Sequence, residues 1–556
     1  MNNNSDAAAP QGECQNISYH LPKWTENGEV IWDDATAQHK SLNAEAHCIK
    51  PPTKVIPVIF IPGIMGTNLK DKKDKSIWRA DLVKGADTLY LLWKSSNERR
   101  NILNVKTTLV DNQGKIKPSN HTVFSDDGNL FPSRAERNWG EALYLSYGEF
   151  LDIFQTTLID DWQKDILNIV LKHKPTSAQE YVSRKGIISN LEGQLIGETQ
   201  DTPLTHEEIA HFKHFLFPVH VFGYNWLVDN AVSAAQLAKY IDKVIETYKQ
   251  KHGYGLAIEK VIIVTHSMGG LIARYAMNPP EGSFQGCQDR VLGVVHGVIP
   301  DLGSPAAYRR MKTGAGKEGT AGLVLGKNAE ELMPVLAFAP APLQLLPSSK
   351  YSTNWLKFDN GESYPKKDPF EEIYLRNDVW WRLYEPDILD NEQAAITENN
   401  KSYTTLMKDF VRTFINHMDE RKYHPYTYVF YGNEVKSDGF LTWIKENKVY
   451  RNPYTGQPVI PQHTTHDRQI IQLPNGEYCE YLLTQSNTAG DGTVPVESLN
   501  EIKKHPLLKG WLATNVDHQD AYEVSGLNPK MFSEAIKFTL QSIIKMVQEV
   551  DIRAAD

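Results

Sequence analysis

The sequence predicts an α/β fold with a mostly parallel, doubly wound sheet. Short apolar, β-branched segments recur at residues 55–63, 218–227, 261–264 and 290–299. Each has the length and composition of a strand that is buried on both faces. Segments with helical periodicity separate them, and this alternation is typical of parallel sheets covered by helices on both sides.

The first elements follow from local signals. Residues 1–54 look like an irregular lead-in, and residues 55–63, "VIPVIFIPG", form a strand closed by Pro-Gly. Residues 70–140 are polar and rich in turn signals, so we expect an insertion of hairpins and loops. Residues 141–173 alternate apolar groups at helical spacing.

The next elements repeat the strand–helix unit. After the strand at residues 218–227, an apolar stripe that ends at Tyr248 predicts an amphipathic helix with Asp229 as its N-cap. The strand at residues 261–264 then leads into a helix from Gly269 onward.

Beyond Pro300 the pattern changes. Residues 301–425 are punctuated by Pro and Gly and mostly helical or irregular, a strand at 426–434 returns to the sheet, and residues 449–485 resemble a β-hairpin. Residues 529–550 close the chain as an amphipathic helix.

These segments predict three parts. A lead-in covers residues 1–54, and an α/β core covers residues 55–300 and 426–556, with an insertion at about 70–215. The third part, residues 301–425, is a cap or lid over the core.

Charge and hydropathy exclude several classes of protein. The net charge of −9 and the pI of about 6.1 argue against a nucleic-acid binder. No apolar run reaches the roughly 18 residues that a spanning helix needs, and the N-terminus has no basic or apolar signal region.

The cysteines do not predict a metal site or a disulfide scaffold. Cys14, Cys48, Cys287 and Cys479 are widely scattered, without zinc-ligand spacing. Free thiols are expected, although one bridge, Cys14–Cys48 or Cys287–Cys479, stays open for an oxidising compartment. We interpret "HTTHD", residues 463–467, as polar surface, so we expect no metal and no cofactor.

The segment "VIIVTHSMGG", residues 261–270, raises the main functional question. A buried strand that ends on Ser267, followed by Gly269 and Gly270, is the pattern of a nucleophile elbow. Thr265 stands where that pattern has its first Gly, which we expect to be crowded but tolerable. The alternative is an ordinary strand–turn–helix that contains a serine.

A serine nucleophile needs a base and an orienting acid. In the α/β-hydrolase fold they follow in the order Ser, acid, His. Asp491 in "GDGTVP" and His518 in "VDHQD" stand in this order. Asp301, directly after a strand, is a second candidate acid, whereas His266 is expected to be a packing residue.

Two backbone N–H groups should stabilise the oxyanion. Met268 follows the serine at a helix N-terminus. The second donor should come from the loop "PGIMG" after the first strand, and we favour Ile64, with Met65 beside it.

These motifs resemble a known group of lipases. "VIPVIFIPGIMGTNL", "THSMGGLIARY", "GDGTVP" and the late "DHQD" are similar to segments of the lecithin:cholesterol acyltransferases, the lysosomal phospholipases and the GPI inositol-deacylase-like lipases. "GYNW" resembles their Y-D-W signature, with Asn225 in place of the acid, and "LLPSS" resembles a cap segment. The similarity spans about half of the chain, as islands.

The chain also looks like a bacterial phospholipase effector of the type VI secretion system. This resemblance implies hydrolysis of glycerophospholipid acyl esters at the A1 or A2 position. It also implies action on the membranes of rival cells, a cognate immunity protein, and export from the cytoplasm without a signal peptide.

Two other functions stay open. An acyltransferase would use the same residues with an alcohol in place of water. A non-catalytic lipid- or protein-binding module would retain the fold alone. The apolar segment 332–346 and the pair Trp380 and Trp381 are apolar enough to line an acyl groove or contact lipid. Plain core packing is the alternative for each single residue, and for the segment as a whole we expect a lid.

Overall fold

The computed structural model describes residues 16–25, 30–32, 44–81, 91, 94–119, 124–171, 185–249, 254–316, 318, 326–389, 393–457, 459 and 468–551. Its centre is a seven-stranded sheet with the strand order β10-β24-β18-β15-β14-β6-β12. The strands are β6 (Val58–Ile61), β10 (Glu198–Thr199), β12 (Val219–Val221), β14 (Val261–His266), β15 (Val291–Gly297), β18 (Thr427–Gly432) and β24 (Leu508–Thr514). All pair in parallel except the edge strand β10. The α/β-hydrolase class is therefore confirmed.

Helices cover both faces of this sheet. Alternate side chains of β6 enter different apolar clusters, Ile59 and Ile61 in one and Val58 and Phe60 in the other. The first cluster includes α6 (Asn230–Lys249) and α7 (Gly269–Met277), and the second includes α3 (Tyr144–Leu171) and α15 (Glu534–Val547). This two-sided burial explains why the strands are continuous apolar runs.

The helix starts agree with the sequence signals. Asp229 caps α6, because its Oδ1 accepts a hydrogen bond of 3.1 Å from the Ala231 N–H, as predicted. The terminal helix α15 begins at Glu534, after the N-cap Ser533, whereas residues Pro529–Met531 form a separate 3₁₀ turn. Pro529 therefore precedes the helix instead of opening it.

Short strands appear in the expected lead-in. β1 (Asn16–His20) pairs in parallel with β4 (Ala44–Cys48), and β2 (Lys23–Trp24) pairs with β3 (Val30–Ile31). A second small sheet joins β5 (Lys54–Val55), β11 (Phe215–Leu216) and β13 (Gly255–Leu256). The polar N-terminal strands carry no apolar alternation, so the sequence does not reveal them.

The insertion that precedes α3 is built from hairpins and loops, as expected. Its sheet comprises β7 (Leu69–Asp71), β8 (Ser76–Trp78) and β9 (Thr108–Val110), and its helix is α2 (Ser96–Ile102). Downstream of α3, α5 (His206–Phe212) carries a capping box on Thr205.

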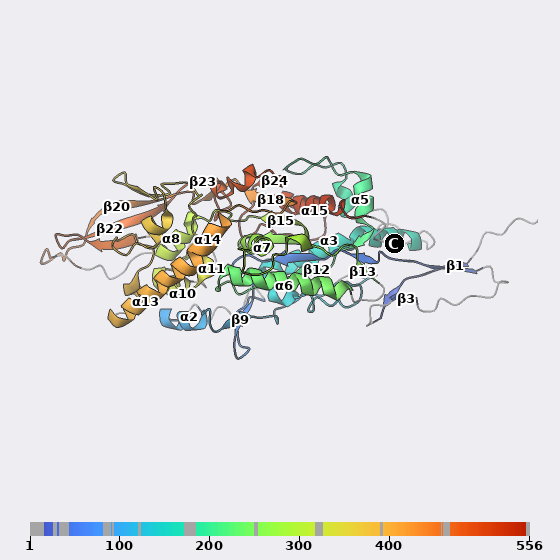
Figure 1. Cartoon of the computed structure of the whole chain (residues 1–556), viewed down its shortest axis with the longest axis horizontal. Helices are drawn as coiled ribbons and strands as arrows, with labels where there is room; N and C mark the ends of the chain where they lie inside the picture. The colour runs from blue at the N-terminus through green and yellow to red at the C-terminus, as the bar shows by residue number, and fades with distance from the viewer. Residues whose placement is uncertain are drawn as a thin grey trace, which may run out of the picture.

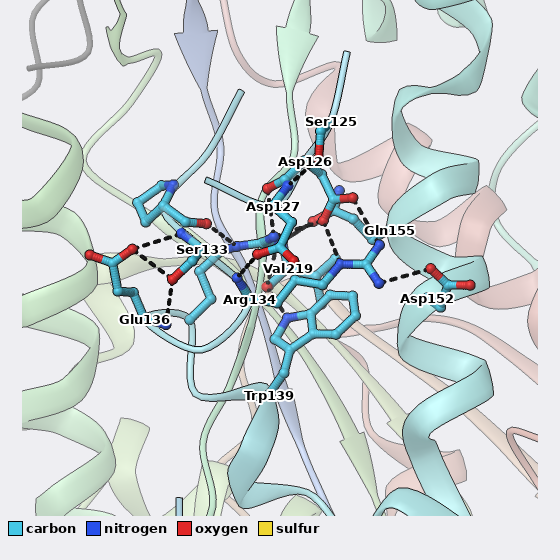
Figure 2. A network of polar contacts seen from close by, with 12 residues as sticks. Ser125, Asp126, Asp127, Ser133, Arg134, Glu136, Trp139, Asp152, Gln155 and Val219 are labelled. Carbon is cyan, nitrogen blue, oxygen red and sulfur yellow. Dashed lines mark hydrogen bonds and ion pairs between the residues drawn. The ribbon is translucent and has the colours of Figure 1, made fainter. Parts of the chain in front are cut away.

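A buried ionic network ties this insertion to the sheet (Figure 2). Asp126 pairs with Arg134 at 2.8 Å and with Arg137 at 2.7 Å, and none of the three side chains is exposed. Arg137 and Trp139 also donate hydrogen bonds to the carbonyl of Val219, in the edge strand β12. The network thus fixes the polar segment before α3 against the core.

Residues 301–425 are largely helical but also contribute strands. The helices are α8 (Pro305–Thr313), α10 (Ala329–Leu336), α11 (Pro340–Leu343), α12 (Pro386–Leu389), α13 (Gln393–Leu406) and α14 (Thr413–Met418). The strands β16 (Leu356–Phe358) and β17 (Ser363–Tyr364) join β20 (Leu441–Val449), β21 (Arg468–Gln472) and β22 (Tyr478–Gln485) in one five-stranded sheet. The expected hairpin at 449–485 is therefore part of a larger sheet.

Figure 1 shows β20 and β22 at one end of the long axis, beside α8, and β1 and β3 at the other. The last two strands, β19 (Val435–Ser437) and β23 (Thr488–Gly490), pair antiparallel. None of the helices in the described residues combines the length and apolar character that crossing a membrane requires.

Candidate active site

The strand β14 ends in a tight, strained turn at Ser267. Ser267 has φ 52°, a left-handed conformation that is uncommon for a residue with a side chain. A Cβ on Gly269 would lie 2.6 Å from the carbonyl oxygen of Pro62. Only glycine allows the helix α7 to approach the neighbouring strand this closely. This is the geometry of a nucleophile elbow.

Thr265 is accommodated by two hydrogen bonds. It is fully buried, and its hydroxyl lies 2.9 Å from Nδ1 of His296. The hydroxyl of Tyr522 donates to the Thr265 carbonyl at 2.9 Å. The motif usually has glycine at this position, and here the buried Thr265 hydroxyl has a hydrogen-bond partner in His296.

Ser267, His518 and Asp491 meet in one hydrogen-bonded line. The Oγ of Ser267 lies 2.8 Å from Nε2 of His518, and Nδ1 of His518 lies 2.7 Å from Oδ2 of Asp491. A carboxylate can only accept, so Nδ1–H donates to Asp491, and the Nε2 lone pair faces the serine hydroxyl. This arrangement can remove the serine proton.

The loop around Asp491 fixes the carboxylate. Oδ1 accepts from the N–H groups of Thr493 and Val494, at 2.9 and 2.6 Å. The backbone N–H of His518 donates to the backbone carbonyl of Asp491 at 2.8 Å. A Cβ on Gly432, at the end of β18, would lie 2.6 Å from the Asp491 Cβ, so this position has no room for a side chain.

The candidate oxyanion loop lies beside the serine. Ile64 and Met65 line the same cavity as Ser267, and Met65 has φ 64°. The indole of Trp78 donates to the Met65 carbonyl at 2.8 Å and holds this turn. The N–H groups of Ile64, Met65 and Met268 have no acceptor within the part of the chain that the structure describes. Their role as oxyanion donors stays a prediction.

Tyr147 is a site residue that the sequence does not reveal. Its hydroxyl accepts from the Gly63 N–H at 3.1 Å and lies 2.5 Å from Nδ1 of His266. Nε2 of His266 lies 2.8 Å from the carbonyl oxygen of His518. Since that carbonyl only accepts, Nε2 carries the proton and Nδ1 accepts from Tyr147.

His266 is therefore more than a packing residue. Burial lowers the pKa of His266 to about 3, so the ring is neutral. In this state it links α3, the loop at Gly63 and the backbone of His518. Tyr147 stands 119 positions before His266, and no local pattern marks such a contact.

An apolar cavity of about 170 Å³ opens above Ser267. The segment expected to form a lid contributes much of its lining: Leu332, Leu336, Pro342, Leu343 and Leu345. Trp380 and Trp381 do not line it. Trp381 stacks on Tyr364 and Trp380 contacts Trp443, so this pair packs in the five-stranded sheet.

The second candidate acid, Asp301, is engaged elsewhere. Its Oδ1 pairs with Arg274 at 2.5 Å, and its Oδ2 accepts from the Tyr423 hydroxyl at 2.7 Å. Both oxygens are thus occupied by groups outside the line of Ser267, His518 and Asp491.

The described residues hold no group of three or more His, Cys, Asp and Glu side chains arranged to bind a metal. Cys48, Cys287 and Cys479 are free thiols, so the Cys287–Cys479 bridge does not form. Cys14 and residues 463–467 lie outside the described residues.

Comparison with known proteins supports the fold and identifies the family. The family model of lecithin:cholesterol acyltransferase matches residues 219–504, more than half of the chain. The match includes Ser267 and Asp491 and ends before His518. No curated protein matches the chain.

The chain is also similar to proteins of known structure. The chain is similar to one in the crystal structure of the Tle4–Tli4 complex, with 26% identity, a TM-score of 0.66, and coverage of 90% of this chain and 100% of that chain. EstA from Clostridium botulinum matches with 14% identity and a TM-score of 0.23 over 60% of this chain and 79% of that chain, too low to support an argument. The chain belongs to the lecithin:cholesterol acyltransferase family and is a lipolytic hydrolase with the α/β-hydrolase fold.

Proposed function

We propose that this protein hydrolyses acyl esters of glycerophospholipids, at the A1 or A2 position, through an acyl-enzyme on Ser267. The observation that supports this most strongly is the line of hydrogen bonds from Ser267 through His518 to Asp491, at 2.8 and 2.7 Å, at the base of an apolar cavity.

In the acylation half, Oγ of Ser267 attacks the ester carbonyl carbon while Nε2 of His518 takes the hydroxyl proton. The oxyanion that forms accepts hydrogen bonds from the backbone N–H of Met268 and from Ile64 or Met65. When the C–O bond breaks, His518 returns the proton to the leaving alcohol oxygen.

In the deacylation half, water replaces the alcohol. His518 removes a proton from the water, whose oxygen attacks the acyl-enzyme carbonyl, and the fatty acid leaves as Ser267 regains its proton. Asp491 keeps Nδ1–H in place throughout and stabilises the imidazolium that forms twice.

The cavity supports a lipid as substrate. Leucine and proline side chains from α10, α11 and the segment that follows them surround the space above the serine. An acyl chain buries apolar surface there, at about 0.8 kcal/mol for each methylene group. We infer that residues 332–346 act as the lid.

We further propose an antibacterial role, as an exported effector that acts on target membranes, with a cognate immunity protein. The similarity to a chain of the Tle4–Tli4 complex supports a protein partner, because that relative was solved as a complex.

Mass analysis of products from purified protein and defined phospholipid vesicles tests this function. We expect free fatty acid and lysophospholipid, with none from the Ser267→Ala variant. A transferred acyl chain, seen when a long-chain alcohol is added, would instead indicate the acyltransferase. Absence of any product, together with binding to the vesicles, would indicate the non-catalytic module.

A further inference from the structure

A second, larger cavity adjoins the apolar one. It measures about 620 Å³, in the range of roughly 300–1,000 Å³ that is common for ligand sites. Its walls come from the C-terminal end of α8, the end of β22 and strand β19. They also include Gly492 and Thr493, next to Asp491, and Asp517 and Gln519, on either side of His518. The cavity therefore borders the proposed catalytic residues.

The two cavities share a wall. Glu318, Thr493 and Gln519 line both of them. Arg310 lines the apolar cavity and Arg309 the larger one, and both pair with Glu318, at 2.6 and 2.7 Å. Burial alone would raise the pKa of Glu318, but the two arginines outweigh it and lower it, so the wall is ionic.

The larger cavity carries both signs of charge. Arg309 is engaged by Glu318 and by Asp438, at 2.7 Å each. Lys436 and Asp517 also line this cavity; both are exposed, and neither forms an ion pair within the described residues. The Asp517 Oδ1 accepts a hydrogen bond of 3.1 Å from the backbone N–H of Gln519, so its Oδ2 and the Lys436 ammonium are the groups that can pair with a ligand.

We propose that this cavity binds the polar head group of a zwitterionic glycerophospholipid, with Lys436 facing the phosphate and Asp517 facing the ammonium group. The inference rests on the proposed function. The acyl chain and the ester then occupy the apolar cavity beside Ser267, and the glycerol extends past the shared residues Thr493 and Gln519 toward the larger cavity. The chemistry of the lining thus distinguishes a phospholipid from a neutral glyceride.

The test compares two lipids that differ only in the head group. Dioleoylphosphatidylethanolamine and dioleoylglycerol are presented separately in non-ionic detergent micelles, and kcat/KM is measured for each. We expect Lys436→Gln to lower the ratio of kcat/KM for the phospholipid to kcat/KM for dioleoylglycerol by about tenfold. This is the effect of losing one charge-assisted hydrogen bond. Lys436→Arg should retain most of the ratio, and Lys436→Glu should lower it further.

Lys530→Gln is the matched control, because this exposed lysine lines neither cavity. Asp517→Asn should lower the preference for phosphatidylethanolamine over phosphatidic acid by about threefold. If Lys436→Gln and Lys436→Glu keep the wild-type ratio, the head-group site is wrong while the proposed function stands. If the wild type releases no fatty acid from either lipid, the proposed function itself fails.

Discussion

At the scale of single residues, His266 and Tyr147 extend the site beyond the three side chains that the motifs predict. His266 precedes Ser267 in the chain, yet its ring is bonded to a helix hydroxyl and to the backbone of His518. A ring held at both nitrogens fixes the position of the His518 loop relative to the serine. We infer that Tyr147 and His266 are positioning residues.

Tyr147→Phe tests this inference. The substitution leaves the Gly63 N–H and Nδ1 of His266 without their partner, and we expect kcat to fall by about tenfold, equivalent to about 1.4 kcal/mol of barrier. KM should change little, because the hydroxyl is engaged by the Gly63 N–H and by His266, and the substitution keeps the ring that lines the cavity. Steady-state kinetics on one phospholipid measures both.

Tyr144→Phe, on the same helix, is the control, because its ring contacts Lys115 and its hydroxyl forms no hydrogen bond within the described residues. If Tyr147→Phe lost stability but retained the wild-type kcat, its role would be structural only.

Glu141 predicts a pH dependence of stability. Burial raises its pKa from 4.5 to about 7, although the Gly223 N–H donates to it. The folded state holds a proton that the unfolded chain has released, so this contribution is full below pH 4.5 and is lost as pH rises through 7. Between pH 5 and 8, the melting temperature of Glu141→Gln should fall by less than that of the wild type. Glu281→Gln, at an exposed site, should behave like the wild type. An unchanged slope would contradict the raised pKa.

At the scale of elements, the elbow depends on how closely α7 approaches β6. Gly269→Ala places a Cβ 2.6 Å from the Pro62 carbonyl oxygen, so the turn must shift. We expect a loss of activity of about 100-fold, because misplacing a nucleophile by about 1 Å has that effect. Gly255→Ala is the control, since its Cβ would meet only the Lys54 Nζ, at 3.9 Å. Equal activity in the two variants would show that the approach is not required.

The ionic network of Figure 2 is a second element-scale feature. Burial alone would raise the pKa of Asp126, but the hydrogen bond from Arg134 and the charge of Arg137 outweigh it and lower the pKa. Asp126→Ala leaves the buried guanidinium of Arg137 without an anionic partner and leaves Arg134 with Asp152 alone, and we expect the free energy of unfolding to fall by about 3–5 kcal/mol.

Chemical denaturation measures this change. Asp165→Ala breaks an exposed pair with Lys213 and should cost less than about 1 kcal/mol. A loss of similar size in both variants would mean that the buried network adds nothing beyond a surface pair.

Elements with strong apolar runs are those that the sequence predicts. The strands β14 and β15 are buried on both faces and read as continuous β-branched segments. The strand β24, "LKGWLAT", lies between β18 and the short edge strand β10; its alternate residues are partly exposed and it contains Lys509 and Gly510. Its pairing with β18, not its own composition, makes it a strand.

At the scale of the whole molecule, the sheet order brings distant segments together. Because β14, β18 and β24 lie close in one parallel sheet, the carboxyl ends of β14 and β24 bring Ser267 and the loop of His518 to the same edge. Asp491 follows β23, in a separate two-stranded sheet, and packs against Gly432 at the end of β18. The motifs and their order predict these three residues. The Tyr147 contact and the shared wall at Glu318 arise from how the insertions pack on the core, and no local pattern encodes that packing.

Reaction with a fluorophosphonate, followed by mass analysis of the intact protein and its peptides, is the most direct test of the site. We predict one adduct per chain, on Ser267, and labelling slowed by several orders of magnitude in His518→Ala. Asp491→Asn should slow it to a smaller extent, because the serine and imidazole remain in contact. Labelling at another residue, or wild-type labelling rates in His518→Ala, would contradict the account.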